Sequence, residues 1–175
     1  MKYYTISFSI NRGIQVEPVE NTKIYPCDNP DYFRDKEFKI YNRKWVPDIL
    51  GMNCVGWPVI SEKFKKVLEE NGFTGYRLVP IKIRELDGNY YILVATNIAK
   101  QKEAPNKNEP LNTNRTYIDL KGLQKADISN VEGTRAIFVN EKVIKALKKN
   151  KIKNLDIYYT KQINDDTLLF DILDS

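Results

Sequence analysis

Hydrophobic and polar residues follow the same pattern in two stretches of this chain. With Val59 placed over Phe138, the two stretches align without a gap, and we call the step in residue number from Val59 to Phe138 the repeat offset. Charged, hydrophobic and turn-forming residues then coincide at seven pairs of positions: Glu62 and Glu141, Lys63 and Lys142, Lys66 and Lys145, Leu68 and Leu147, Asn71 and Asn150, Lys82 and Lys161, and Asp87 and Asp166. Self-similarity at a fixed offset predicts an internal repeat.

Each copy begins with the pattern of a capped amphipathic helix. A short hydrophobic stretch leads into Ser61 or Asn140, whose side chains can accept a hydrogen bond from a backbone N–H of the first helical turn. The pair Asn71-Gly72 predicts the end of the first helix, and Asn150-Lys151 is a weaker stop. Hydrophobic residues at i, i+3 and i+4 spacing predict one buried face per helix: Phe64, Val67 and Leu68, then Val143, Ile144 and Leu147.

A β-hairpin is predicted after each helix. In the first copy, Ile81 and Ile83 alternate with charged residues, and the turn sequence Asp87-Gly88 precedes a returning strand, YYILVAT. In the second copy, LDIYYT and LLFDIL flank a polar turn over 164–166. Two copies of this helix–strand–turn–strand unit that share one core predict an α+β fold with a mainly antiparallel sheet.

The chain of 175 residues is long enough for one sizeable domain, which we divide into four segments. Residues 1–57 form an N-terminal strand and loop segment, and 58–96 form the first repeat unit. A linker and strand segment over 97–136 precedes the second unit at 137–175. Residues 97–115 are almost wholly polar and contain two prolines, so they predict the longest loop.

The composition argues against catalysis. The chain contains no histidine, which removes the commonest general base and every histidine-containing zinc site. Its two cysteines, Cys27 and Cys54, cannot form a metal-binding cluster, and whether they pair with each other is left open. No complete phosphate-loop, dinucleotide-binding or nucleophile-elbow motif occurs. We therefore expect no enzymatic activity, no cofactor and no metal site.

Two pairs of carboxylates are the remaining candidates for chemistry. Asp28 with Asp31, or Asp165 with Asp166, could hold a metal or share acid and base roles in a hydrolase. Both pairs occur among Asn and Pro in predicted turns, where aspartate is favoured for its local hydrogen bonds. The turn interpretation is therefore favoured over the hydrolase.

Charge and hydropathy narrow the choice of partners. With 28 Lys and Arg against 23 Asp and Glu, the net charge of +5 permits an anionic partner without demanding one. No run of 18 hydrophobic residues occurs, and the N-terminus alternates like a strand, so we expect a cytoplasmic protein without a membrane span or signal peptide.

The Lys-rich stretch over 142–153 offers an alternative function, a basic nucleic-acid-binding or regulatory module. A solvated helix face is the favoured interpretation, because no aromatic residues are interleaved with the lysines.

Aromatic side chains outside the repeat are the better candidates for a protein interface. Tyr and Trp are enriched in interfaces because they bury a large rigid area and keep one polar group. We expect partner binding at four residues before the first repeat unit, with two lysines at the rim: Tyr32, Phe33, Arg34 and Trp45, then Lys148 and Lys149.

The segment WVPDIL, the helix and strand that start at Val59, the strand YYILVATNI and the weaker second helix together resemble a known family. They are similar to the immunity proteins of bacterial polymorphic-toxin systems, specifically immunity family eleven, formerly a domain of unknown function. The resemblance covers about residues 45–175, and in the second unit Asn140 and Asn154 stand where the family has Ser and Gly. The residues that carry it are packing and capping signals: Pro47, Asp48, Ser61, Glu62, Leu68, Gly75 and Pro80.

The resemblance implies a cytoplasmic antidote. Such a protein binds a cognate toxin domain and blocks its active site or a required motion, without any catalysis of its own. The resemblance does not identify the toxin. Because complementary charge speeds capture, a basic antidote makes a cationic nuclease toxin the less expected partner.

Overall fold

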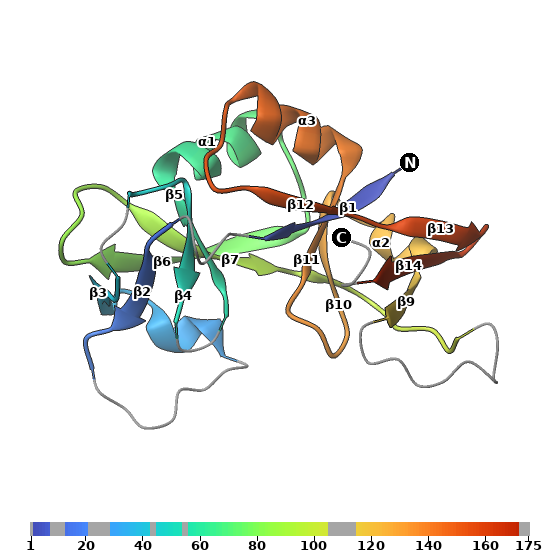
Figure 1. Ribbon diagram of the computed structural model, residues 1–175, viewed down its shortest axis with the longest axis horizontal. Helices are drawn as coiled ribbons and strands as arrows, with labels where there is room; N and C mark the ends of the chain where they lie inside the picture. The colour runs from blue at the N-terminus through green and yellow to red at the C-terminus, as the bar shows by residue number, and fades with distance from the viewer. Residues whose placement is uncertain are drawn as a thin grey trace.

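The computed structural model describes residues 2–7, 13–20, 29–42, 45–53, 56–104 and 115–171. The fold is mixed α+β, and most of its regular structure is strand (Figure 1). In chain order the elements are β1 (Tyr3–Ser7), β2 (Gln15–Pro18), the short 3-10 helix η1 (Pro30–Phe33), β3 (Glu37–Ile40), β4 (Ile49–Met52), β5 (Pro58–Ser61), α1 (Glu62–Glu70), β6 (Tyr76–Ile83), β7 (Tyr90–Ala95), β8 (Asn97–Ala99), β9 (Arg115–Asp119), α2 (Leu120–Leu123), β10 (Ile128–Val131), β11 (Ile137–Asn140), α3 (Glu141–Lys149), β12 (Asp156–Tyr159), β13 (Lys161–Asn164) and β14 (Thr167–Asp171).

Six strands close into a small barrel at one end of the molecule, on the left in Figure 1. The strand order is β2-β3-β6-β7-β5-β4, and β2 also pairs with β4 to close the ring. Side chains fill the barrel, and Phe33 and Phe38 are the largest that are fully buried in it. The barrel interior is one of the hydrophobic cores of the molecule.

The rest of the chain forms two further sheets. A five-stranded sheet has the order β12-β1-β11-β10-β8, and a three-stranded sheet has the order β13-β14-β9. The N-terminal strand β1 lies inside the five-stranded sheet, antiparallel to both β11 and β12 from the end of the chain. Backbone hydrogen bonds therefore join the N-terminal strand to two strands of the C-terminal half of the chain.

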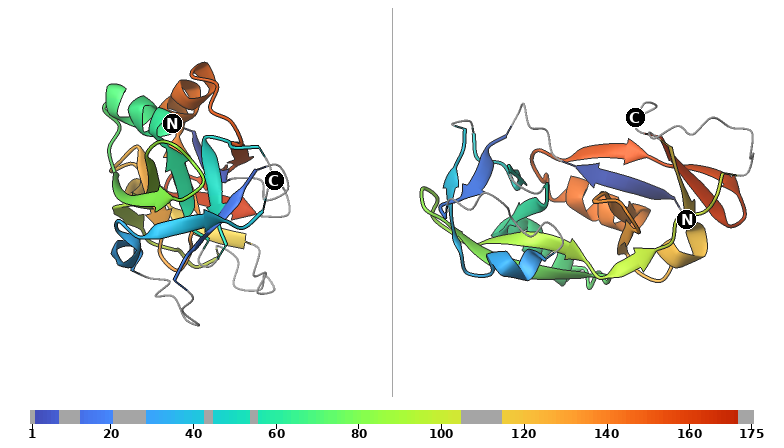
Figure 2. Two further views of the ribbon diagram at one scale, coloured as in Figure 1. Left: turned by 90° about the vertical axis from the view of Figure 1, so that its left-hand side faces the viewer. Right: turned by 90° about the horizontal axis from the view of Figure 1, so that it is seen from below.

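Helices α1 and α3 lie side by side over the middle of the molecule (Figures 1 and 2). Both predicted N-caps are confirmed: the Ser61 side chain accepts from the N–H of Phe64, and the Asn140 side chain accepts from Lys142 and Val143. All six hydrophobic residues predicted on the inner faces are buried, and they meet in one core with residues of the five-stranded sheet and of the barrel strands.

The hairpin predicted after the second helix is wrong in its first strand. The turn lies at 165–166, within the predicted 164–166, but the strand that precedes it is β13, and β12 pairs with β1 instead. β1 offers β12 a register of four residue pairs, the Thr160 hydroxyl donates to the carbonyl of Tyr3, and the rings of Tyr4 and Tyr159 meet edge to face. These partners lie at the other end of the chain, so no local signal reveals them.

The long loop predicted over 97–115 is also partly wrong. Residues 97–99 form β8, which runs parallel to β10, and Gln101 makes an isolated bridge with Ile118 of β9. The Asn97 side chain anchors β8 by donating to the Ser129 hydroxyl and to the carbonyl of Gly122. Residues 105–114 lie outside the described residues.

Candidate functional site

The four residues predicted as partner-binding anchors do not form one surface. Phe33 is fully buried, with its ring centroid 5.8 Å from that of Phe38, so its assignment as an exposed anchor is wrong. The reason is that η1 packs into the barrel, and Phe33 fills the barrel core. Tyr32 is half-buried against Phe33, at 5.1 Å between ring centroids, with the Lys36 ammonium 4.1 Å from the Tyr32 ring.

Asp31 of η1 is joined to the barrel by Arg77 and is paired locally with Arg34. The Arg34 guanidinium lies 2.7 Å from the Asp31 carboxylate, and Arg77 of β6 lies 2.8 Å from the other oxygen of the same carboxylate. Hydrogen bonds from Arg34 and then Arg77 hold the pKa of Asp31 below its ordinary value. This arrangement secures η1 against the barrel, which gives Asp31 and Arg34 a structural role.

Trp45 lies elsewhere, on the segment before β4, and its side chain is 45% exposed. The Lys153 ammonium lies 5.9 Å from the centroid of the Trp45 ring. Lys148 and Lys149 are exposed in the last turn of α3, a few residues before Lys153. The structure thus places Trp45 beside Lys153, which follows the Lys-rich end of α3, and leaves Tyr32, Phe33 and Arg34 in and around η1.

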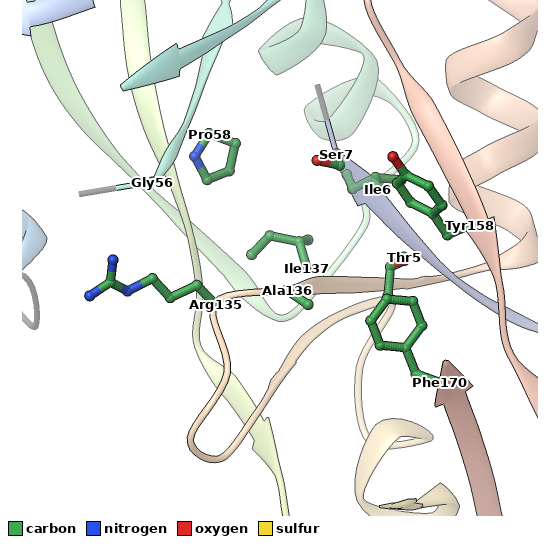
Figure 3. A pocket seen from close by; sticks show the side chains of 10 residues that line it. All are labelled: Thr5, Ile6, Ser7, Gly56, Pro58, Arg135, Ala136, Ile137, Tyr158 and Phe170. Atoms are coloured by element: carbon green, nitrogen blue, oxygen red, sulfur yellow. The ribbon is translucent and has the colours of Figure 1, made fainter. Parts of the chain in front are cut away.

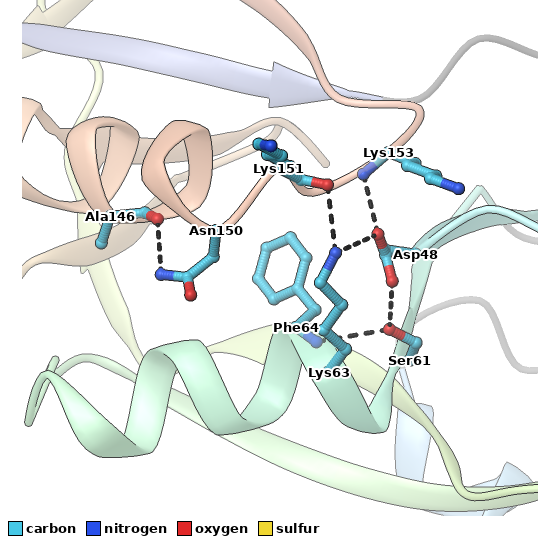
Figure 4. Close-up of polar contacts among 8 residues, drawn as sticks. All are labelled: Asp48, Ser61, Lys63, Phe64, Ala146, Asn150, Lys151 and Lys153. Atoms are coloured by element: carbon cyan, nitrogen blue, oxygen red, sulfur yellow. Dashed lines mark hydrogen bonds and ion pairs between the residues drawn. The ribbon is translucent and has the colours of Figure 1, made fainter.

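The segment that carries Trp45 is fixed by Asp48, which joins the two helices (Figure 4). One carboxylate oxygen accepts a hydrogen bond from the Ser61 hydroxyl at 3.1 Å, and the other accepts from the backbone N–H of Lys153 at 2.8 Å. Lys63 donates to the same oxygen as Lys153, at 3.4 Å, and also to the carbonyl of Lys151 at 3.1 Å. The start of α1, the end of α3 and the Trp45 segment are therefore held together at one point.

Three members of this cluster were missed as site residues by reasoning from the sequence. The sequence pattern predicts a solvated helix face that includes Lys151 and Lys153, but both follow the end of α3. Asp48 carries the family resemblance and is not among the predicted site residues. Its position after Pro47 and directly before a hydrophobic strand was the available signal.

Of the two carboxylate pairs considered for catalysis, the structure describes both members of only one, Asp165 with Asp166. Asp165 and Asp166 form the β13–β14 turn, and Lys102 lies 2.7 Å from the Asp166 carboxylate. Hydrogen bonds from Lys102 and then Thr167 lower the pKa of Asp166. Asp28 lies outside the described residues, as do Cys27 and Cys54. Within the ranges that the structure describes, no three histidine, cysteine, aspartate or glutamate side chains are arranged to hold a metal ion.

A cavity of about 430 Å³ opens between the start of β5 and strands β1, β11 and β14 (Figure 3). The rings of Tyr158 and Phe170 and the hydrophobic side chain of Ile137 form much of its wall. Thr5, also in the wall, is 2% exposed, and its hydroxyl makes no hydrogen bond within the described part of the chain. The cavity is large enough for one side chain of a partner or a small molecule.

Comparisons with known proteins do not identify the site. The chain matches none of the protein-family models and none of the curated protein sequences. Among the described residues, the structure contains no helix with the length and hydrophobicity needed to cross a membrane.

Proposed function

We propose that this protein is a cytoplasmic immunity protein, which binds a cognate bacterial toxin domain and neutralises it by stoichiometric contact. The observation that carries the proposal is Trp45, a large aromatic side chain that is 45% exposed on a segment fixed by Asp48. Tryptophan is among the residues most enriched at binding hot spots. A support that is already ordered lowers the entropy cost of binding.

The resemblance to immunity family eleven supports the same proposal. Two of the residues that carry the resemblance, Asp48 and Ser61, hydrogen-bond to each other at 3.1 Å. The backbone N–H of Ser61 also donates to the carbonyl of Asp48 at 2.9 Å. In this chain these motif residues hold the segment that presents Trp45.

We also propose that the scaffold contains a repeated strand–helix unit. Strands β5 and β11 each run directly into a nine-residue helix, and the bounds of these elements differ by the repeat offset. The helices also end alike, because the N–H of Phe73 donates to the carbonyl of Leu68 and the N–H of Ile152 donates to that of Leu147. After the helix the unit differs from the predicted one. In the second copy β12 pairs with β1, and the hairpin is formed by β13 and β14.

A basic nucleic-acid-binding module is the second candidate function. It is favoured by the four exposed lysines at and after the end of α3: Lys148, Lys149, Lys151 and Lys153. Such a module would lose binding in proportion to the phosphate contacts removed, and its affinity would fall steeply with salt.

The direct test is co-expression in a bacterial host with the C-terminal domain of a candidate toxin encoded by a neighbouring gene. An immunity protein restores growth and co-elutes with the toxin domain as one complex in gel filtration. Equal growth with and without the protein, together with the absence of a complex, would refute the proposal. A labelled single-stranded oligonucleotide, titrated at two salt concentrations, tests the second candidate in parallel.

A further inference from the structure

The contacts around Asp48 have a counterpart around Asp127, which lies one repeat offset later in the chain. One oxygen of Asp127 accepts from the Asn140 side chain at 2.7 Å, and the other accepts from the backbone N–H of Thr74 at 3.0 Å. Each aspartate therefore joins the N-cap of the helix that follows it to the segment after the other helix. We call these two places the Asp48 junction and the Asp127 junction.

The strands that lead into the two junctions match as well. Ile49 of β4 pairs with Ile60 of β5, and Ile128 of β10 pairs with Val139 of β11. In each hairpin the first strand also pairs, in parallel, with a strand from outside it, β2 or β8. The pairs between β4 and β5 and those between β10 and β11 are related by the repeat offset.

Strands β1 and β7 occupy equivalent places. β1 lies in the N-terminal half of the chain and pairs with strands of the C-terminal half, whereas β7 lies just past the middle of the chain and pairs with strands of the N-terminal half. Tyr91 of β7 lies between Ile60 and Pro80, which belong to β5 and β6. Tyr4 of β1 lies between residues 139 and 159, of β11 and β12, and these are again one repeat offset further along the chain. The first strand of each half of the chain therefore pairs with strands of the other half. Because the surrounding strands match in this way, the two junctions can be compared position by position.

The two junctions differ in the side chains that they expose. The Asp48 junction carries Trp45, Lys148, Lys149, Lys151 and Lys153, which we call the basic junction surface. At the same positions, the Asp127 junction carries Gln124, Glu69, Glu70, Gly72 and Thr74. Because the Asp127 junction forms without an aromatic or basic residue at these five positions, the fold does not require those residues at the Asp48 junction.

Stabilisation of the helix end does not explain why lysines occupy these positions either. Lysines in the last turn of a helix interact favourably with the helix dipole. Helix α1, however, has the same length as α3 and ends in Glu69 and Glu70. Within the described residues, none of the four lysines of the basic junction surface forms an ion pair, and all four are exposed.

Resting on the proposed function, we infer that the basic junction surface is where this protein binds its partner, and that the partner is a protein with an acidic surface. Trp45 would bury its exposed face as the anchor, and the lysines would pair with carboxylates around it. Complementary charge of this kind steers association and raises its rate. A cationic toxin face would instead be repelled here and attracted to the end of α1.

A triple charge reversal tests the inference: Lys148→Glu, Lys149→Glu and Lys153→Glu. The first two changes place in α3 the residues that α1 already carries at equivalent positions, so we expect the helix to form. The matched control reverses three exposed lysines elsewhere, with the same change in net charge: Lys82→Glu, Lys125→Glu and Lys161→Glu. A third variant, Trp45→Ala, removes the anchor alone.

The measurement is binding kinetics on a sensor surface that carries an inactivated candidate toxin domain from a neighbouring gene, at low and high salt. The triple variant should associate at least about tenfold more slowly at low salt, with the difference shrinking as salt rises. The control should differ from wild type by no more than about threefold. Trp45→Ala should raise Kd by about thirtyfold or more, chiefly through faster dissociation.

The possible outcomes separate the surface from the function. If wild type binds the toxin domain and the triple variant and Trp45→Ala bind equally well, the surface is wrong and the function stands. If wild type does not bind the toxin domain at all, the proposed function fails. Lysine-dependent binding of a short single-stranded oligonucleotide instead, or lysine-dependent self-association in light scattering, would assign the surface to nucleic acid or to a second copy and overturn the inference.

Discussion

Replacing Asp127 with alanine should destabilise the fold by about 2–4 kcal/mol, a sum of two losses of hydrogen bonding. The largest part comes from Asn140, which is only 3% exposed and loses the acceptor 2.7 Å from its amide nitrogen. A buried donor left without a partner costs about 1–3 kcal/mol. Thr74 loses two further bonds to Asp127, at 3.0 and 2.9 Å, but it is exposed, so water can replace them and they add about 1 kcal/mol.

Urea unfolding followed by circular dichroism measures the change in the free energy of unfolding. Asp165→Ala is the matched control, because Asp165 is exposed in the β13–β14 turn and should change stability by no more than about 0.5 kcal/mol. Asp48→Ala should resemble Asp127→Ala, since the two carboxylates accept equivalent hydrogen bonds. If Asp127→Ala were as stable as the control, the reasoning about both junctions would be refuted.

Three more predictions use the same unfolding measurement. Leu68→Ala and Leu147→Ala each remove a fully buried side chain of the shared core and should cost about 2–5 kcal/mol; a loss below about 1 kcal/mol would contradict that core. Burial raises the pKa of Asp127, but its hydrogen bonds outweigh burial and lower the pKa overall. The carboxylate therefore adds to the free energy of unfolding above about pH 4, the unfolded pKa, and this stabilisation is lost as the pH falls through the folded pKa. Asp127→Asn should therefore lose stability less steeply than wild type below about pH 4, and parallel curves would argue against a carboxylate at the junction. Gly75→Ala should lower the free energy of unfolding by more than about 2 kcal/mol, because φ is +86° and a Cβ would lie 2.1 Å from a backbone oxygen. Gly88→Ala, with open space around the new Cβ, should lower it by less.

The local parts of the fold could be predicted from the sequence because their signals are local. Ser61 and Asn140 cap helices that follow them directly, and the spacing of Phe64 and Leu68 fixes which helix face is buried. The Asp165 turn is local too. Each of these depends on residues within one or two helical turns of each other.

The long-range parts could not be predicted by the same reasoning. The pairing of β1 with β12 joins Tyr4 to Tyr159, and nothing near either residue selects the other. A weak signal existed, since Tyr3-Tyr4 and Tyr90-Tyr91 begin equivalent strands. The two tyrosine pairs lie further apart than the repeat offset, however, so an alignment fixed at that offset passes over them.

The candidate site shows the same division. Because Phe33 lies in a turn-rich segment, the sequence predicts an interface residue, and only the structure reveals that its side chain fills the barrel core. The sequence did single out Trp45, Lys148 and Lys149, but it gave no reason to place them near one another. That reason is Asp48, whose contact with the backbone after α3 spans 105 positions of the chain.

The measurement that tests the central claim most directly is calorimetric titration of this protein with an inactivated candidate toxin domain from a neighbouring gene. A stoichiometric antidote predicts saturation at about one protein per toxin domain, with Kd in or below the nanomolar range typical of tight interfaces of standard size. Loss of toxin activity should reach completion at the same ratio. The absence of binding heat at two temperatures, together with undiminished toxin activity at a large excess of this protein, would contradict the claim.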